Sequence, residues 1–278
     1  MFYVEEKMLI FLNIVRRTGE FASITCQKLH KYSNAVKYYE SSLSLNHANA
    51  KVLCNLGYCY SELDEVDKAI DNCEESIKID SEYYLPHYIL GNLNYKLKNY
   101  DKSIIFFEKA LELNSNLHEA WYKIGLNHFS KKKYDKAIAC YQKVVSLDPK
   151  NDSCLEALGD AYLITAQVDK AFDCYQKVLG VTPGSTSSLY KLADIYTKQE
   201  NLKDAVECYK DIIKYDPYDF LALQKLGDIR LTEKSFIEAL GYYTKAHDVK
   251  PEEPSILKNL AKCYEKISIF PKAEEYYK

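Results

Sequence analysis

Cysteine and histidine are the residues of this 278-residue chain whose chemistry is tested first, because both bind metals and both act in catalysis. The nine cysteines include no Cys-x-x-Cys pair, and the six histidines lack the spacing of metal ligands. Cys140, Cys174 and Cys208 recur every 34 residues. If these cysteines lie one helix spacing apart, about 9 Å, they exceed the ~7 Å Cα limit of a disulfide. We therefore expect no metal, and free thiols that pack in the interior of a protein from a reducing compartment.

The short motifs of nucleotide binding and hydrolysis are also absent. The sequence has no glycine-rich phosphate loop, no Gly-x-Ser-x-Gly and no His-Glu-x-x-His, and His118-Glu119 only begins like the last of these. A formal net charge of -3 gives no electrostatic basis for binding nucleic acid or an anionic membrane. We predict no catalytic residue, no cofactor, no nucleic-acid partner and no membrane partner, in a cytoplasmic or nuclear protein.

A pair of residues, leucine followed by glycine, returns at a fixed interval along the chain. Starting from Leu56-Gly57, the pair or a close substitute follows every 34 residues at Leu90-Gly91, Ile124-Gly125, Leu158-Gly159, Leu192-Ala193, Leu226-Gly227 and Leu260-Ala261. Small residues form a second column thirteen positions after each leucine, at Ala69, Ser103, Ala137, Ala171, Ala205, Ala239 and Ala273, with Ala35 one period earlier. The chain therefore divides into repeats that start near residues 16, 50, 84, 118, 152, 186, 220 and 254.

Each repeat predicts two amphipathic helices joined by a short polar turn. Counted from the start of a repeat, apolar residues fall at positions 4, 7, 8 and 11 and again at 20, 21, 24, 27 and 28, which is helical spacing. We expect the glycine at position 8 to face the alanine at position 20 where the two helices cross. The bulky residues at positions 4, 7, 11 and 24 would then fill the space between successive hairpins.

These columns together resemble the tetratricopeptide repeat (TPR) family. The resemblance covers residues 16–278 and implies an all-α fold, a right-handed superhelical solenoid of antiparallel helix hairpins. Residues 1–15 are expected to add a capping helix, and the first repeat is the least regular, with Gly19, Ala22 and Ser23 in the first-helix columns. The last repeat stops at its position 25, Lys278, which suggests self-association through an uncapped end or a longer protein.

In this family the first helix of each repeat lines a concave groove, with positions 2, 5, 6, 9, 12 and 13 pointing into it. Read at these positions, the candidate partner-binding residues of repeats 2 to 4 are Asn55, Tyr58, Tyr88, Asn92, Tyr95, Tyr122, Lys123, Leu126 and Phe129. Aromatic anchors commonly supply binding energy at interfaces. The alternative interpretation is that the tyrosines pack only against neighbouring helices.

Three aspartates occupy position 9 of repeats 5 to 7, namely Asp160, Asp194 and Asp228. Such a ladder would favour a partner with a basic segment. Lys191 and Lys225 stand three residues before the second and third of these aspartates, so ordinary ion pairs within one helix are the alternative.

The resemblance implies a non-catalytic scaffold that binds a peptide segment of a partner protein in the groove. The clamp that holds the terminal carboxylates of heat-shock chaperones is not matched, because Tyr88 and Asn92, then Lys123, then Ser153 and Ala157 occupy its positions.

Two alternatives to a free scaffold remain. One is the substrate-recruiting region of a larger enzyme, such as an O-GlcNAc-transferase-like glycosyltransferase, although the asparagine ladder of those enzymes is reduced here to Asn55 and Asn259. The other is a subunit of a ciliary, transport or cell-cycle assembly. The repeats alone do not distinguish these alternatives from a free scaffold.

Overall fold

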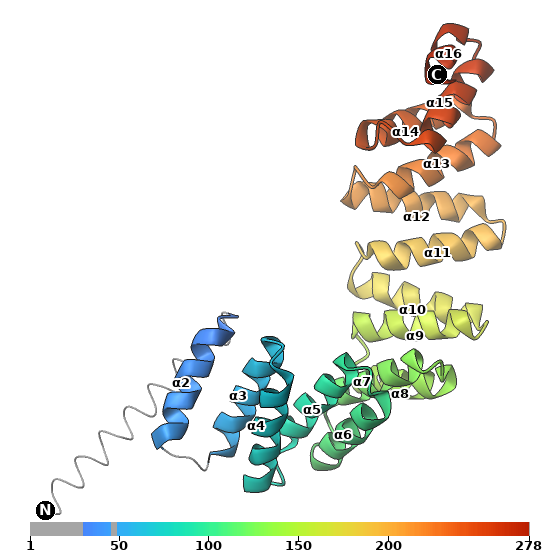
Figure 1. Cartoon of the computed structure of the whole chain (residues 1–278). Helices are drawn as coiled ribbons and strands as arrows, with labels where there is room; N and C mark the ends of the chain where they lie inside the picture. Colours follow the sequence, from blue (N-terminus) through green and yellow to red (C-terminus); the bar gives the residue numbers. More distant parts are fainter. Residues whose placement is uncertain (1–29, 46–48, 278) are drawn as a thin grey trace, which may run out of the picture. The chain divides into compact units, whose positions relative to one another are not determined.

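A computed structural model describes residues 30–45 and 49–277, and this part of the chain consists of fifteen α-helices without a strand (Figure 1). The first helices of the repeats are α3 (Ala50–Glu62), α5 (Tyr84–Lys96), α7 (His118–Ser130), α9 (Asp152–Ile164), α11 (Thr186–Lys198), α13 (Phe220–Thr232) and α15 (Pro254–Lys266). The second helices are α2 (Tyr32–Leu45), α4 (Val66–Ile79), α6 (Tyr100–Leu113), α8 (Tyr134–Leu147), α10 (Val168–Val181), α12 (Leu202–Tyr215), α14 (Phe236–Val249) and α16 (Phe270–Tyr277). The chain is an all-α solenoid of helix hairpins, as the sequence predicts.

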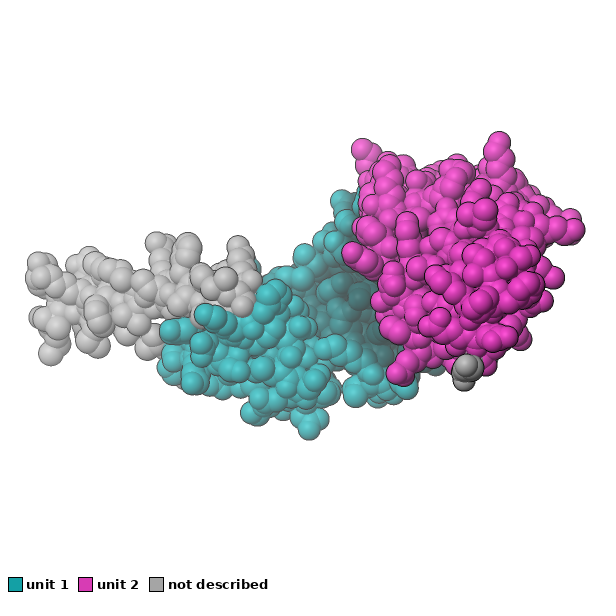
Figure 2. Space-filling view, turned by 90° about the horizontal axis from the view of Figure 1, so that it is seen from above, with its two compact units in different colours: residues 1–149 teal, residues 150–278 magenta. Residues whose placement is uncertain are grey.

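The 34-residue register of the helices agrees with the repeat starts read from the sequence, because each first helix from α3 onward begins at the predicted residue. The predicted capping helix at 1–15 and the first helix of repeat 1 lie outside the described residues. The chain forms two compact units, unit 1 up to Pro149 and unit 2 from Lys150 (Figure 2). Within each unit, the two helices of a repeat pack together, and each second helix packs on the first helix of the next repeat.

The core of each hairpin adds a contact to the one expected from the sequence. The glycine at position 8 lies near position 20, since a Cβ atom on Gly57 would stand 3.1 Å from the carbonyl oxygen of Ala69, and it also lies under the side chain at position 24 of the same repeat. A Cβ atom on Gly125 would stand 2.4 Å from Cε1 of Tyr141, and one on Gly91 would stand 2.7 Å from Cε1 of Phe107. Both rings are fully buried. The ring at position 24 therefore fills its own hairpin, and in these two repeats a residue without a side chain leaves room for it.

The turn inside each hairpin has one backbone conformation throughout the described repeats. Position 15 has a positive φ of 56° to 63°, at His30, Asp64, Lys98, Lys132, Ala166, Glu200, Lys234 and Ser268. In repeat 3 the amide of Asn99 donates to the carbonyl of Asn94 at 2.8 Å, and the amide of Lys98 donates to that of Tyr95 at 2.9 Å. This pair of bonds is the Schellman motif, which satisfies carbonyl groups at the end of a helix.

Two serine side chains in the core donate hydrogen bonds to backbone carbonyl groups of the neighbouring helix. Ser103 takes the place of alanine at position 20, and its hydroxyl donates to the carbonyl of Gly91 at 2.7 Å. Ser76 at position 27 does the same within repeat 2, donating to the carbonyl of Ala50 at 2.7 Å. These bonds leave neither buried hydroxyl unpaired.

No helix within residues 30–45 and 49–277 is both long enough and apolar enough to cross a membrane.

Candidate functional site

A pocket of about 630 Å³ opens in unit 1 along the first helices α3, α5 and α7. We call it the tyrosine pocket, and its lining residues are Cys54, Asn55, Tyr58, Ser61, Glu62, Leu85, Tyr88, Ile89, Asn92, Tyr95, Lys96 and Lys123. Every one of these residues occupies position 2, 5, 6, 9, 12 or 13 of its repeat. The pocket therefore lies on the face that the family resemblance assigns to the groove.

Six of the residues predicted from the sequence meet in this pocket, namely Asn55, Tyr58, Tyr88, Asn92, Tyr95 and Lys123. Three others of unit 1, Tyr122, Leu126 and Phe129, do not line it. The ring of Tyr122 packs on Tyr141, with centroids 5.8 Å apart, and that of Phe129 packs on Tyr134 at 5.3 Å.

Several residues that line the tyrosine pocket in repeats 2 and 3 were not predicted from the sequence. Ser61 and Glu62 stand at positions 12 and 13 of α3, and Leu85 stands at position 2 of α5. The groove positions include all three, but their side chains are not the aromatic and amide types that mark a binding surface in the sequence.

The three tyrosines of the pocket wall are each supported from behind by another aromatic ring. Tyr58 packs edge-on against Tyr32 of α2, with ring centroids 6.1 Å apart. Tyr88 packs edge-on against Phe107 of α6 at 5.5 Å. Tyr95 packs at a tilt against Tyr100 of α6 at 5.8 Å. Because aromatic pairs of this kind add to the stability of packing, the wall is held in shape before any ligand arrives.

Burial changes the acidity of groups in the pocket wall. Desolvation, followed by the hydrogen bond with Tyr32 and the charge of Glu62, raises the pKa of Tyr58 to about 12. Desolvation raises the pKa of Cys54 to about 12 as well, against a smaller lowering by its hydrogen bond with Tyr83. Both groups are neutral at physiological pH, so Cys54 is no nucleophile and Tyr58 offers a phenol rather than a phenolate.

The remaining polar groups of the tyrosine pocket are two amides, two ammonium groups, the hydroxyl of Ser61 and the carboxylate of Glu62. The amide of Asn92 donates to the carbonyl of Tyr88 at 3.2 Å, which fixes its side chain along α5. Lys96 donates to the carbonyl of Ser61 at 3.2 Å and so connects α5 with α3. Lys123 reaches the pocket from α7 and is partly buried. Desolvation alone lowers the pKa of this ammonium group.

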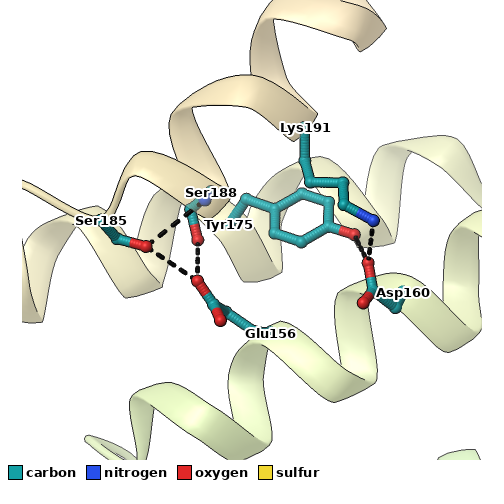
Figure 3. Close-up of polar contacts among 6 residues, drawn as sticks. All are labelled: Glu156, Asp160, Tyr175, Ser185, Ser188 and Lys191. Carbon is teal, nitrogen blue, oxygen red and sulfur yellow. Dashed lines mark hydrogen bonds and ion pairs between the residues drawn. The ribbon is translucent and has the colours of Figure 1, made fainter. Parts of the chain in front are cut away.

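In unit 2 the first aspartate of the ladder is used inside the protein (Figure 3). One oxygen of Asp160 accepts a bond from the hydroxyl of Tyr175 at 2.7 Å and another from the ammonium of Lys191 at 2.8 Å. Tyr175 is at position 24 of the same repeat, whereas Lys191 is at position 6 of the next. The ion pair of Lys191 therefore joins two repeats, and the expected pairing of Lys191 with Asp194 inside α11 is not the one that forms.

A second carboxylate, that of Glu156, also accepts hydrogen bonds at the boundary between repeats 5 and 6. Glu156 accepts from the hydroxyls of Ser185 and Ser188, each at 2.8 Å, and Ser185 in turn caps the start of α11 (Figure 3).

The other two aspartates of the ladder differ from each other. Asp228 repeats the pattern, because it accepts from Tyr243 at 2.7 Å and from Asn259 of the next repeat at 3.2 Å. Asp194 is exposed, and its charge adds to desolvation in raising the pKa of Tyr209. Two of the three aspartates are thus engaged within unit 2.

Within residues 30–45 and 49–277, no three His, Cys, Asp or Glu side chains gather as metal ligands. The cysteines that the structure describes from Cys54 to Cys263 are buried free thiols.

Comparison with known proteins agrees with the helix hairpins. Models of the tetratricopeptide repeat match residues 50–83, 85–117, 118–151 and 186–219. A search of curated proteins finds no significant match.

Among solved structures, the C-terminal part of a TPR repeat-containing protein from Cytophaga hutchinsonii is similar over 88% of this chain and 99% of its own, with 17% identity and a TM-score of 0.76. YrrB, described as a TPR protein with an unusual peptide-binding site, is similar over 66% of this chain and 95% of its own, with 22% identity and a TM-score of 0.55. MamA is similar over 58% and 94%, with 25% identity and a TM-score of 0.53.

Arrays of this fold act as protein-interaction scaffolds, since their stacked repeats build extended surfaces for binding. The matching repeats, the hairpin architecture and the similar structures lead to one conclusion: the chain belongs to the tetratricopeptide repeat family and is a protein-interaction scaffold.

Proposed function

We propose that unit 1 of this scaffold binds a peptide segment of a partner protein in the tyrosine pocket. The observation that carries the proposal is the wall itself, in which Tyr58, Tyr88 and Tyr95 are each backed by a second ring and still border open space. A volume of about 630 Å³ lies within the range of about 300–1,000 Å³ that is usual for ligand sites.

The chemistry of the lining suits a polypeptide. Tyrosine rings offer rigid, partly apolar surfaces for side chains of the partner. The amides of Asn55 and Asn92 can both donate to and accept from a peptide backbone. An extended segment loses conformational entropy when it binds, so we expect a dissociation constant of about a micromolar. The peptide-binding site of YrrB, a protein of similar fold, is consistent with this proposal.

The aspartate ladder of unit 2 is a weaker candidate for binding a basic segment. Asp160 and Asp228 already accept hydrogen bonds from their own and the next repeat. A basic ligand would compete with Lys191 for Asp160, and only Asp194 is exposed. We therefore assign the principal site to unit 1.

The test is a selection of random twelve-residue peptides, displayed on phage, against the full chain, followed by fluorescence anisotropy with the selected peptides. We expect Tyr88→Ala to weaken their binding by about tenfold or more, as truncation of a buried aromatic anchor does.

Tyr122→Ala is the matched control. Tyr122 stands at position 5 of repeat 4, as Tyr88 does in repeat 3, and each ring packs on the position-24 ring of its own repeat. Only Tyr88 lines the pocket. Both variants should lose similar stability in thermal unfolding followed by circular dichroism, while only Tyr88→Ala loses peptide binding. Equal losses of binding in the two variants, or no peptide enriched by the wild-type chain, would contradict the proposal.

A further inference from the structure

Lys123 differs from the two other lysines that stand at position 6 of a repeat, Lys191 and Lys225, because each of those follows an aspartate at position 9 of the preceding repeat. Lys225 is exposed and forms no ion pair with Asp194, whereas Lys191 does pair with its aspartate. In unit 2, Lys191 at position 6 meets Asp160 at position 9 of the preceding repeat and forms an ion pair at 2.8 Å. In unit 1, the residue at position 9 of the repeat before Lys123 is Asn92, which carries no charge. Lys123 thus occupies the place of Lys191 without the carboxylate that neutralises it.

Nothing else in the described part of the chain supplies that carboxylate. No Asp or Glu there lies within ion-pair distance of the Lys123 ammonium, which also has no hydrogen-bond partner among the described residues. Glu62 lines the same pocket, but it ends α3, and α5 packs between α3 and α7. A partly buried ammonium group without a counter-ion has already lost part of its hydration, so it gains more than an exposed one from an incoming anion.

The rest of the pocket lining indicates which chemical group of the ligand should accompany its negative charge. Apart from the polar groups already described, the lining that accompanies Lys123 is aromatic and aliphatic, with Tyr58, Tyr88, Tyr95 and Leu85 among its residues. A ligand that fills it needs a bulky apolar group next to its negative charge.

We propose that the tyrosine pocket selects a partner segment in which an aspartate or glutamate stands beside a bulky apolar residue. The carboxylate pairs with Lys123 at the α7 side, and the apolar side chain packs against the tyrosine wall. This inference rests on the proposed function, because it names the chemistry of the peptide that the pocket binds. It assigns an acidic partner to unit 1, in contrast to the basic partner that the aspartates of unit 2 would favour.

The inference predicts a sequence pattern among the selected peptides and a charge-dependent response to substitution. Peptides that bind in a Tyr88-dependent way should be enriched in an acidic residue next to Phe, Leu, Ile, Met or Trp. Lys123→Met should weaken their binding by about tenfold, the size expected for a hydrogen bond between charged groups. Replacing the acidic residue of the peptide with its amide should have the same effect on the wild-type chain and little further effect on Lys123→Met.

Lys136→Met is the control for the loss of one positive charge, since Lys136 is exposed on α8 and does not line the pocket. Lys123→Glu adds a second readout, because it should turn the preference of the pocket toward peptides in which Lys replaces the acidic residue. Retention of affinity in Lys123→Met, with binding still lost in Tyr88→Ala, would overturn the inference and leave the proposed function standing. Loss of affinity in Lys136→Met equal to that in Lys123→Met would also overturn it.

Discussion

The contact of a ring with a glycine is the smallest feature that decides how a repeat packs. The rings of Tyr141 and Tyr243 lie against Gly125 and Gly227, so close that a Cβ atom on either glycine would stand 2.4 to 2.6 Å from a ring carbon. Since the rings are fully buried, they have no free space into which to move. The glycines are required by this contact and not by a special φ.

This contact predicts opposite effects for the same substitution at two glycines. Gly125→Ala should lower the free energy of unfolding by about 1–3 kcal/mol, because the added methyl group overpacks the core. Gly241→Ala should raise it by up to about 1 kcal/mol, because Gly241 lies inside α14 with open space around it. Urea titration followed by circular dichroism measures both. A neutral result for Gly125→Ala would contradict the ring contact.

The sequence predicts the small-residue columns and their approach to each other, but it does not predict the side chain that covers the glycine. Gly57 and Ala69 were identified from spacing alone, since a column of small residues needs only a close approach between helices to explain it. That the side chain at position 24 covers the glycine depends on the angle between the helices, which spacing does not state. The pairing of Asp160 with Lys191 across a repeat boundary depends on the same geometry. Because spacing does not give this geometry, Tyr122 was predicted to be a site residue, although its ring packs on Tyr141 and it does not line the pocket.

At the scale of elements, the turn inside each hairpin is built without glycine. Position 15 takes the left-handed conformation in eight described turns, with residues as different as Asp64, Ala166 and Ser268. For a residue with a side chain this conformation costs about 1–2 kcal/mol relative to a right-handed helix. No residue preference marks position 15, so the sequence predicts a turn there and not its conformation.

Ala166 allows the strain to be measured, because alanine has no polar side chain that could compensate for it. Ala166→Gly should raise the free energy of unfolding by about 0.5–1 kcal/mol, since glycine adopts a φ of 58° without strain but loses more entropy on folding. Ala139→Gly, at an exposed position of α8, should lower it by about 1 kcal/mol. Chemical denaturation of the two variants gives the comparison, and a fall in stability for Ala166→Gly would contradict the assigned turn.

At the scale of the whole molecule, unit 1 contains both of the described histidines whose pKa values are lowered. Desolvation lowers the pKa of His87, with a further contribution from Lys109, and the pKa of His128, with contributions from Lys136, Lys133 and Lys131. Nδ1 of each ring lacks a hydrogen-bond partner among the described residues. Protonation of either ring therefore favours the unfolded state of unit 1.

The stability of unit 1 should therefore decrease as the pH decreases. In the unfolded chain these histidines have a pKa near 6.5 and bind protons more readily than in the folded unit, so stability falls as the pH falls from about 7.5 to 5.5. Trp121, the one tryptophan of the sequence, packs on the core of unit 1 and reports its unfolding by fluorescence. The urea midpoint of this signal should decrease over that pH range. In His87→Gln with His128→Gln the decrease should be smaller; an unchanged dependence would assign it to other groups.

The residues at positions 9 and 6 across a repeat boundary also have a consequence for how such arrays diversify. With Asp160 before Lys191 the boundary neutralises its own charge, and with Asn92 before Lys123 the ammonium group stays available to the acidic partner that we propose. The two cases differ by the exchange of an amide for an acid. Asparagine and aspartate codons differ by a single base, so one point mutation can add or remove the internal counter-ion of a partly buried lysine at position 6, while the buried residues that hold the repeats together stay as they are. The exposed Lys225 forms no pair with Asp194, so the aspartate acts in this way only where the lysine is held close to it.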